Sequence, residues 1–299
     1  MVLLSALLFS SNPQNDLIIF VSSSDPLLEN PYSILITNPE NFQDSPSVYN
    51  DLKIKYYASI VFVAWLLEQA NLELLKNFTI KNKFVFKIAN NTIRNNFQVK
   101  YNTILNENES VLIPTSLLIG GSTTLDSIGI LNLIQLEFEK TNTNITLLFT
   151  IKGSGALLLD GRSGNLNVII SHSPEQEIEY INNGFALCRI NFINSSFILI
   201  GPTANQANLQ NNTNILEAFN QIQLTRSIFI SRGDSSGTHF KELEIWMLAN
   251  ISIDPNNSTW NKANIWYVET GNSQANSFRI AQEKNGYMLI DEPTFLVLT

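Results

Sequence analysis

The sequence predicts an α/β protein with a largely parallel sheet that has helices on both faces. Three observations lead to this prediction. Hydrophobic residues make up 44% of the 299 residues, which is enough for a substantial core. From about residue 117 onward, short apolar runs alternate with segments of helical periodicity. Glycine, serine and threonine gather where a predicted strand gives way to a helix, as is typical of strand–loop–helix units.

The first third of the chain contains two short apolar strands and one long helix. Residues 16–22 and 33–37 are apolar runs bounded by Pro, Ser and Asn, and they are predicted strands. Residues 49–77 repeat apolar side chains at helical spacing. Residues 95–114 are polar and irregular, and we interpret them as a linker. Residues 1–9 are apolar but too short to span a bilayer, so they are either a strand or the remainder of a trimmed leader.

The remaining elements follow in a regular order. Strands are predicted at 117–119, 144–150, 167–171, 197–200, 227–230, 265–269 and 287–290. Helices are predicted at 126–140, directly after residues 153–155, at 240–249 and at 274–284. No internal repeat and no segment that qualifies as transmembrane is found, and the chain is expected to be soluble.

Composition restricts the classes of function. Charged residues are 15% of the chain, against roughly 25% in an average soluble domain, and the net charge is −8. This balance argues against a nucleic-acid partner, because no basic patch could displace counterions. The single cysteine, Cys188, excludes an internal disulfide and is predicted to be a small buried residue.

Asparagine is abundant and creates many acceptor sites for N-linked glycans. An Asn-rich chain produces such sites by chance, whereas a low charge also fits a glycosylated surface protein, and both interpretations stay open. The candidate sites are Asn77, Asn90, Asn108, Asn144, Asn194, Asn211, Asn250, Asn256 and Asn257.

Three loops have a similar composition and position. Each contains glycine together with Ser or Thr, directly after a predicted strand and before a helix. They are 120–124, 153–155 and 233–238. Glycine lets backbone N–H groups approach a ligand, hydroxyls add donors, and a helix N-terminus favours negative charge. A structural explanation exists for any one of them, since αβ joints commonly need glycine and capping residues. Three such loops, with Arg232 beside the third, indicate a site for a small oxyanion.

Other chemistries find little support. The chain has no Gly-x-x-x-x-Gly-Lys-Ser/Thr phosphate loop, and 153–155 lacks the third glycine of a dinucleotide fingerprint. The two histidines, His172 and His239, have no metal-ligand spacing with cysteines or carboxylates. Asp234, Ser236 and His239 are close in sequence, but this does not define a catalytic triad. We therefore expect that the protein is not an enzyme and that it has no catalytic residue, no metal and no cofactor.

The order of these motifs resembles that in a family of solute-binding proteins of ABC importers, the tungstate-binding proteins, whose ligands are oxyanions. The strongest match is 231–239 (SRGDSSGTH), followed by 266–271 (WYVETG). Residues 123–127, 153–156, 168–174 and 197–202 are similar to further segments of that family in the same order. Residues 16 to about 88, including 30–32 (NPY) and 62–67, resemble the carboxy-terminal part of the family. The chain is therefore identified as an apparent circular permutant.

The resemblance implies a two-lobed, type II periplasmic-binding-protein-like fold with mixed, mostly parallel sheets and an anion held between lobes. One lobe would combine 39–95 with 117–192, and the other 201–299 with 1–30, the latter possibly completed by a neighbouring chain. Residues 31–38 and 193–200 would be the hinge strands, and 96–116 would join the usual family termini, a gap that about 20 extended residues can span. The implied anion-binding residues are Thr123, Thr124, Ser154, Arg232, Ser236 and Thr238.

Two departures from the family pattern concern the ligand. The first loop of the family is richer in hydroxyls than this one, which has Gly120 and Gly121. The family usually carries an arginine near residues 291–294, where this chain has Glu292, an acidic residue that could repel a doubly charged anion.

Two classes of function follow. The first is an extracellular or cell-surface binding protein that captures tungstate or molybdate for an ABC permease. The second is a subunit of a glycosylated extracellular filament, built head to tail through apolar ends at 1–9 and 295–298 that would complete a sheet between chains, with anion binding reduced or lost. A monomeric surface protein that only kept the fold is the third interpretation.

Overall fold

The computed structural model describes residues 17–22, 24–89, 114–210 and 214–299. The predictions made for 1–9, for most of the 96–116 linker, and for Asn90, Asn108 and Asn211 lie outside these residues. The chain divides into two compact units. Unit 1 comprises Met1–Leu27, Ile198–Asp234 and Glu242–Ile290, and unit 2 comprises Leu28–Phe197, Ser235–Lys241 and Asp291–Thr299. The predicted lobe of 201–299 with 1–30 included residues 235–241 and 291–299, whereas in the structure both segments belong to unit 2.

A mixed sheet forms the centre of unit 2. Its strand order is β9-β2-β8-β6-β7, and β5 also pairs with β9. Strand β6 pairs with β7 on one side and with β8 on the other, and both pairs are parallel. Strand β2 runs antiparallel to both β8 and β9. These strands are β2 (Glu29–Thr37), β5 (Lys87–Ile88), β6 (Thr115–Ser122), β7 (Ile145–Lys152), β8 (Val168–Ser171) and β9 (Ala186–Pro202).

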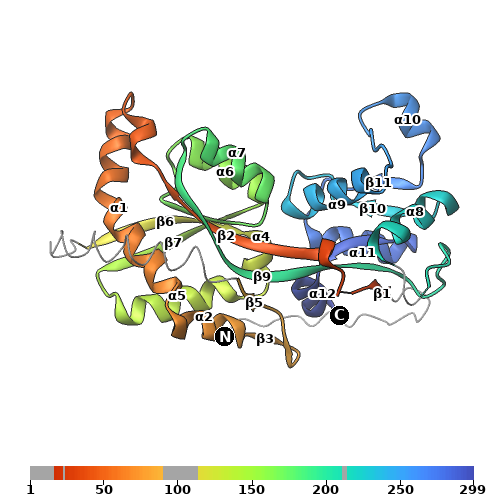
Figure 1. The fold of residues 1–299 in the computed structure, drawn as a ribbon, viewed down its shortest axis with the longest axis horizontal. Helices are drawn as coiled ribbons and strands as arrows, with labels where there is room; N and C mark the ends of the chain where they lie inside the picture. Colours follow the sequence, from red (N-terminus) through yellow and green to blue (C-terminus); the bar gives the residue numbers. More distant parts are fainter. Residues whose placement is uncertain (1–16, 23, 90–113, 211–213) are drawn as a thin grey trace, which may run out of the picture. The chain divides into compact units, whose positions relative to one another are not determined.

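Helices cover both faces of this sheet because its inner strands are apolar on both sides. On β2, Ile34 and Ile36 pack in one buried cluster with side chains of α1 (Pro46–Leu66) and α5 (Ile130–Thr141). Leu35, between them, packs on the other face against α6 (Ser154–Arg162) and α7 (Pro174–Asn182). Figure 1 shows α6 and α7 on one side of the sheet and α5 on the other. Such continuous apolar runs are typical of strands buried on both faces.

Shorter elements complete unit 2. They are η2 (Pro26–Leu28), which begins in unit 1, η3 (Pro39–Phe42), α2 (Gln69–Lys76), the small hairpin of β3 (Thr79–Ile80) and β4 (Lys83–Phe84), α4 (Thr123–Ser127) and α12 (Glu292–Leu298). Asp291 caps α12 by accepting a hydrogen bond from the Thr294 amide, which favours helix initiation.

Unit 1 is built around aromatic side chains. The parallel strands β10 (Phe229–Ser231) and β11 (Tyr267–Glu269) pair side by side, and Phe229 also bridges to Tyr287 just before β12 (Met288–Asp291). Trp246 lies in the middle of this core, with ring centroids 4.3 Å from Phe219 and 5.0 Å from Phe229. The surrounding elements are β1 (Leu17–Val21), which pairs antiparallel with the end of β9, and the helices α8 (Ile215–Thr225), α10 (Ser258–Ala263), α11 (Gln274–Lys284) and α9 (Gly237–Leu248), of which Gly237–Lys241 belongs to unit 2.

The structure corrects several local predictions. The long helix predicted at 49–77 is two helices, α1 and α2, and the helix at 126–140 is split into α4 and α5 by Gly129, whose φ is +81°. Residues 295–298, predicted as a strand-forming end, belong to helix α12. Helices α7 and α8 have no counterpart in the prediction. Helix α7 has few apolar residues, whereas in α8 the buried Ile215, Ala218, Phe219 and Ile222 recur at helical spacing that the prediction overlooked.

Within the described residues, no single helix is long and apolar enough to cross a membrane. Helices α1 and α2 reach that threshold only as a pair that is bent by 63°.

Candidate functional site

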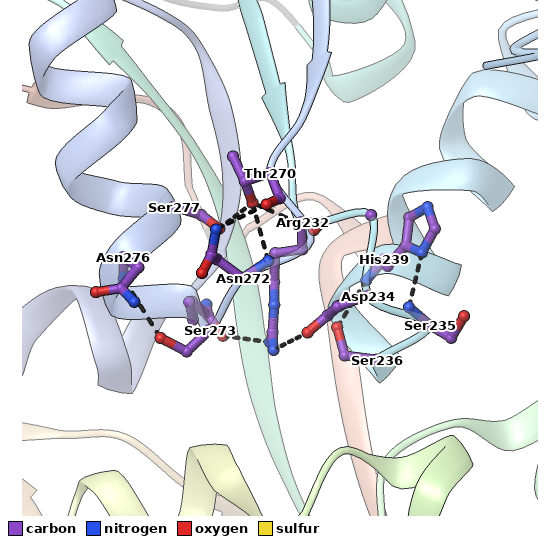
Figure 2. Close-up of polar contacts among 12 residues, drawn as sticks. Arg232, Asp234, Ser235, Ser236, His239, Thr270, Asn272, Ser273, Asn276 and Ser277 are labelled. Carbon is purple, nitrogen blue, oxygen red and sulfur yellow. Dashed lines mark hydrogen bonds and ion pairs between the residues drawn. The ribbon is translucent and has the colours of Figure 1, made fainter.

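Thr270 makes several of the contacts that hold the loop after β10 in unit 1. The Thr270 amide and hydroxyl both donate to the Ser231 carbonyl, at 3.0 and 3.2 Å, and the hydroxyl also lies 3.2 Å from the Arg232 carbonyl. A further bond of 2.7 Å joins the Thr270 hydroxyl to Ser277 on α11 (Figure 2). Gly233 follows with a φ of +59°, a conformation that glycine adopts without strain. The backbone around Arg232 is thus fixed by the next strand and helix.

Arg232 is a buried cation in unit 1. Its side chain is only 4% exposed. One guanidinium nitrogen, Nη1, donates to Gln274 Oε1 at 3.3 Å, and the other, Nη2, forms an ion pair with Asp234 Oδ2 at 2.5 Å. Gln274 is the first residue of α11. A buried guanidinium with fixed partners is suited to recognise an anion, because little side-chain entropy remains to be lost on binding.

A buried carboxylate lies beneath the same loop. Glu242 Oε1 accepts hydrogen bonds from Tyr267 Oη at 2.7 Å and from Trp246 Nε1 at 3.1 Å. The Ser231 hydroxyl is a further partner of this carboxylate. Burial raises the pKa of Glu242 to about 7, and its hydrogen bonds oppose that shift. The charge directly under the arginine loop therefore changes near neutral pH.

Unit 2 brings the second and third predicted loops together. A Cβ at Gly153 would lie 3.7 Å from Ser236 Cβ, and one at Gly155 would lie 3.1 Å from the Ser235 carbonyl. Ser154 is fully buried, and its hydroxyl accepts from the His172 amide at 3.3 Å. Ser236 and Thr238 are 2% and 1% exposed. The N-termini of α6 and α9, with their buried hydroxyls, therefore lie side by side in this unit.

His239 has a structural role, as its position on the first turn of α9 indicates. Its Nδ1 accepts a hydrogen bond from the Ser235 amide at 3.1 Å, and its own amide donates to the Ser236 hydroxyl at 3.4 Å (Figure 2). Ser235 has a φ of +57°, so this contact supports a left-handed residue. Neither bond activates Ser236 as a nucleophile, since that would require the imidazole to accept the serine proton.

The first predicted loop is shorter than the sequence suggests. Gly120 and Gly121 belong to β6, and a Cβ at Gly121 would lie 2.5 Å from Leu131 Cδ1 in the core. Thr123 and Thr124 open α4, which Ser122 caps through a 3.4 Å bond from the Leu125 amide. The Thr124 hydroxyl is buried and has no partner among the described residues. Such a group needs water or a ligand as its partner.

A second buried carboxylate organises unit 2. Asp291 Oδ2 accepts from Asn30 Nδ2 at 2.7 Å, Ser195 Oγ at 3.0 Å and Tyr32 Oη at 3.2 Å. Asn30 Oδ1 lies 3.0 Å from His172 Nδ1, so this nitrogen must carry the proton. Burial raises the pKa of Asp291 to about 6, against the opposing effect of its hydrogen bonds. Glu292, the next residue, is half-buried at the start of α12.

Sequence reasoning named Arg232, Ser154, Ser236 and the three threonines Thr123, Thr124 and Thr238, but it missed the neighbouring residues that contact them. Thr270, Gln274 and Asp234 hold the arginine loop, and Asn30 and Asp291 orient His172. Only Asp234, inside the 231–239 motif, could have been found from the sequence, since a carboxylate two residues from an arginine is a plausible partner. Within the described residues, no group of three or more His, Cys, Asp or Glu side chains could hold a metal ion.

The described acceptor sites for N-linked glycans differ in accessibility. Asn194 lies inside β9, half-buried, and its amide donates to Glu29. The other described sites are exposed, namely Asn77, Asn144, Asn250, Asn256 and Asn257. Cys188 is half-buried rather than fully buried.

Comparison with known proteins places this arrangement in a family. A family model described as a PBP superfamily domain matches residues 108–296. The tungstate-binding protein TupA of Campylobacter jejuni is 32% identical over 171 residues, which cover 57% of this chain and 60% of that protein. A tungstate ABC transporter structure from Geobacter sulfurreducens has a TM-score of 0.54 at 28% identity, over 62% of this chain and 76% of that one.

A second solved structure, the tungstate-binding protein TupA of Desulfovibrio alaskensis G20, has a TM-score of 0.50 at 30% identity, over 61% of this chain and 69% of that one. The chain spans about 60% of the length of the curated tungstate-binding relatives that it matches.

Proposed function

Because the chain belongs to the PBP superfamily, we propose that it is a non-catalytic solute-binding protein for a tetrahedral oxyanion such as tungstate. The names of its relatives support this ligand class, since two curated relatives and two similar structures are named for tungstate. Molybdate has the same charge and tetrahedral shape, so it is the second ligand to test.

The observation that carries the proposal is the buried Arg232 guanidinium on a rigid loop. Arg232 is 4% exposed, and its contacts with Asp234 and Gln274 offset the cost of burying the cation. A guanidinium held in this way can provide charge-assisted donors to an anion. Thr270 and Gln274 fix the loop and the guanidinium. The geometry is thus set before any ligand arrives, which lowers the entropic cost of binding.

The hydroxyls of unit 2 support the same ligand class. Ser154, Ser236 and Thr238 are buried at helix N-termini, and Thr124 has a hydroxyl with no partner in the described structure. Hydroxyls and helix N-termini donate to anionic oxygens without requiring a protonated ligand. A fully deprotonated tetrahedral dianion fits such donors.

The test is calorimetric titration of the purified chain with sodium tungstate, sodium molybdate and sodium sulfate. We expect tungstate to bind, and Arg232→Gln to weaken the affinity by about 10- to 100-fold, the value of a charge-assisted hydrogen bond. Arg279→Gln is the matched control, because Arg279 is exposed on α11 and loses the same charge. No heat with tungstate or molybdate, together with an unchanged melting temperature, would refute the proposal.

The partner and the location follow from the same proposal. A binding protein of this class delivers its ligand to an ABC permease, so we place the chain on the extracytoplasmic side of the membrane, either free or at the cell surface. Glycans at Asn77, Asn144, Asn250, Asn256 and Asn257 are compatible with their exposure. Mass spectrometry of the native protein, before and after glycosidase treatment, tests this part.

We further propose that the chain is circularly permuted relative to its relatives. Support comes from the alignments, which cover about 60% of this chain and of each curated relative, and from the family match, which begins at residue 108. A rearranged gene that begins near residue 108 and joins Thr299 to Asp16 through a flexible linker should yield a protein with the same tungstate affinity. Failure of that protein to fold would count against the permutation.

The filament alternative has no support in the comparisons. Its proposed C-terminal strand, 295–298, is part of α12 and therefore offers no edge for another strand.

A further inference from the structure

A chain of hydrogen bonds in unit 2 connects the buried carboxylate of Asp291 to the two helix N-termini that carry candidate anion-binding hydroxyls. We propose that Asp291, acting through Asn30 and His172, is a positioning residue that keeps the N-termini of α6 and α9 in a binding-competent arrangement only while its carboxylate is ionised. The inference rests on the proposed function, because it adds a pH-dependent control to the same site.

His172 touches the start of both helices. Its amide donates to the hydroxyl of Ser154, the first residue of α6, at 3.3 Å. A Cβ on Gly237, the first residue of α9, would lie 2.8 Å from both the carbonyl oxygen and Cε1 of His172, so α9 begins in direct contact with it. Ser236 and Thr238, the candidate hydroxyls of α9, flank this glycine. A shift of His172 would therefore displace the hydroxyls of both helices.

The His172 ring is held by two aromatic neighbours and one amide. It is 4% exposed and stacks between Tyr32 and Phe197, with ring centroids 5.0 and 6.4 Å away. Its protonated Nδ1 donates to Asn30 Oδ1 at 3.0 Å, while Asn30 Nδ2 donates to Asp291 Oδ2 at 2.7 Å. The Asn30 amide thus transmits the state of Asp291 to the ring.

The carboxylate is arranged so that one proton changes this connection. Three side-chain donors, from Asn30, Ser195 and Tyr32, converge on the same oxygen, Oδ2 of Asp291. Protonation there replaces an acceptor with an O–H donor, and the Asn30 amide then satisfies Asp291 only by turning its carbonyl toward that O–H. This turn brings Nδ2 against the protonated Nδ1 of His172. Two donors cannot bond, so the contact that orients the ring is lost.

Asp291 changes charge within the pH range that matters. Burial raises its pKa to about 6, against the opposing effect of its hydrogen bonds. Burial also raises the pKa of Tyr32 well above its ordinary value, so that hydroxyl stays neutral. Arg189 is paired with Glu177. The titratable or charged residues on β2, β9 and α12 are Glu29, Tyr32, Cys188, Arg189 and Glu292.

The first test follows the imidazole nitrogens of isotopically labelled protein by NMR between pH 5 and pH 8. The chain has two histidines, so His239 is an internal reference. We expect the His172 signals to shift with a midpoint near the pKa of Asp291, about 6, and Asp291→Asn, which retains a good helix cap, to abolish the shift. Glu292→Gln should retain it. Persistence of the shift in Asp291→Asn, or its loss in Glu292→Gln, would overturn the inference.

The second test is calorimetric titration of the wild-type chain and Asp291→Asn with sodium tungstate at pH 8 and pH 5. Relative to the variant, the wild-type affinity should fall about tenfold at pH 5, because only about a tenth of its carboxyls remain ionised there. Taking the ratio at each pH cancels any protonation of tungstate itself. Glu283→Gln is the matched control, since Glu283 is exposed at the far end of α11 and also loses one carboxylate.

The outcomes separate this inference from the proposed function. A ratio of affinities that stays constant with pH, while both proteins bind tungstate, overturns the inference alone. Absence of binding by both proteins at pH 8 overturns the proposed function.

A milder variant covers the case in which Asp291→Asn does not fold. Ser195→Ala removes one donor that favours the ionised carboxyl, so the midpoint of the His172 shift should move to higher pH. Ser59→Ala is its control, since the Ser59 hydroxyl is buried in α1 and donates to the Lys55 carbonyl. An unmoved midpoint in Ser195→Ala would overturn the inference.

Discussion

The Tyr267 hydroxyl donates a 2.7 Å hydrogen bond to Oε1 of Glu242, and both side chains are buried in unit 1. Desolvation is the largest effect on both groups, and it raises the pKa of each. The pair lies under β10, whose last residue, Ser231, is a further partner of Glu242. This is a carboxylate held in apolar surroundings directly behind the arginine loop.

Glu242→Gln should remove a pH dependence of stability. Because the folded pKa is about 7 and the ordinary value is 4.5, the folded state binds more protons than the unfolded state between these values. The free energy of unfolding therefore falls as pH rises through this window, by about 3 kcal/mol in total. Urea unfolding of the variant at a series of pH values should show this slope reduced, with Glu283→Gln unchanged from wild type. An identical slope in Glu242→Gln would contradict the assignment.

Asn30→Ala should destabilise the protein more at pH 8 than at pH 5. Asn30 donates to Asp291 and lies 3.0 Å from His172 Nδ1, so its loss removes one hydrogen bond from each of two buried groups at a cost of about 1–3 kcal/mol. The pKa of Asp291 is raised to about 6, so this carboxyl is ionised at the higher pH and needs the donor most there. Thermal melting at both values measures the difference.

The control for that experiment is Asn183→Ala, because Asn183 is exposed and its side-chain amide donates to the nearby Glu179 carbonyl. An equal loss of stability for Asn30→Ala at pH 5 and pH 8 would argue that the amide supports packing alone.

Gly237→Ala should destabilise unit 2. An alanine Cβ at this position would lie 2.8 Å from both the carbonyl oxygen and Cε1 of His172, so backbone would have to move. We expect a loss of about 1–3 kcal/mol in the free energy of unfolding, as for other overpacked sites. Gly153→Ala is the matched control, since its nearest neighbour would be 3.7 Å away and its φ of −67° suits alanine. Comparable stability of the two variants would refute the close contact.

Gly121→Ser should restore a hydroxyl without improving tungstate binding. The new Cβ would face Leu131 and Ile151, at 2.5 and 3.3 Å, because Gly121 lies within β6 and not in a ligand loop. The variant should lose about 1–3 kcal/mol of stability, and Leu131→Ala in the same chain should recover part of that loss. Calorimetry and urea unfolding measure the two effects. Tighter tungstate binding would show that this position faces the ligand.

Much of the local structure could be predicted from the sequence where the spacing of apolar residues and the positions of turn and capping residues agree. The strand at 167–171 and the helix at 274–284 appear within one residue of their predicted bounds, as β8 and α11. Two helices were not predicted. Helix α7 has few apolar residues, so its sequence pattern is a weak signal and packing stabilises it, whereas the helical spacing of Ile215, Ala218, Phe219 and Ile222 in α8 was overlooked.

The glycines of the first loop show a second limit of prediction. A glycine pair before Thr123 and Thr124 indicates a turn, yet both glycines continue β6 because Leu131, Leu157 and Leu166 leave no room for a side chain beside them. Which residue fills that space depends on helices that are distant in the sequence, so no local pattern could reveal it.

By itself, the sequence determined which ligand class to propose and which residues to examine for it. The 231–239 motif, the hydroxyls after three strands and the absence of metal-ligand spacing all follow from residue types and short spacings. Only the tertiary structure decided what surrounds Arg232. Gln274 and Thr270 reach it from about forty residues further along the chain, while Asp234 reaches it because Gly233 turns the backbone. Burial then sets the charge of these groups, and burial is a property of the folded chain.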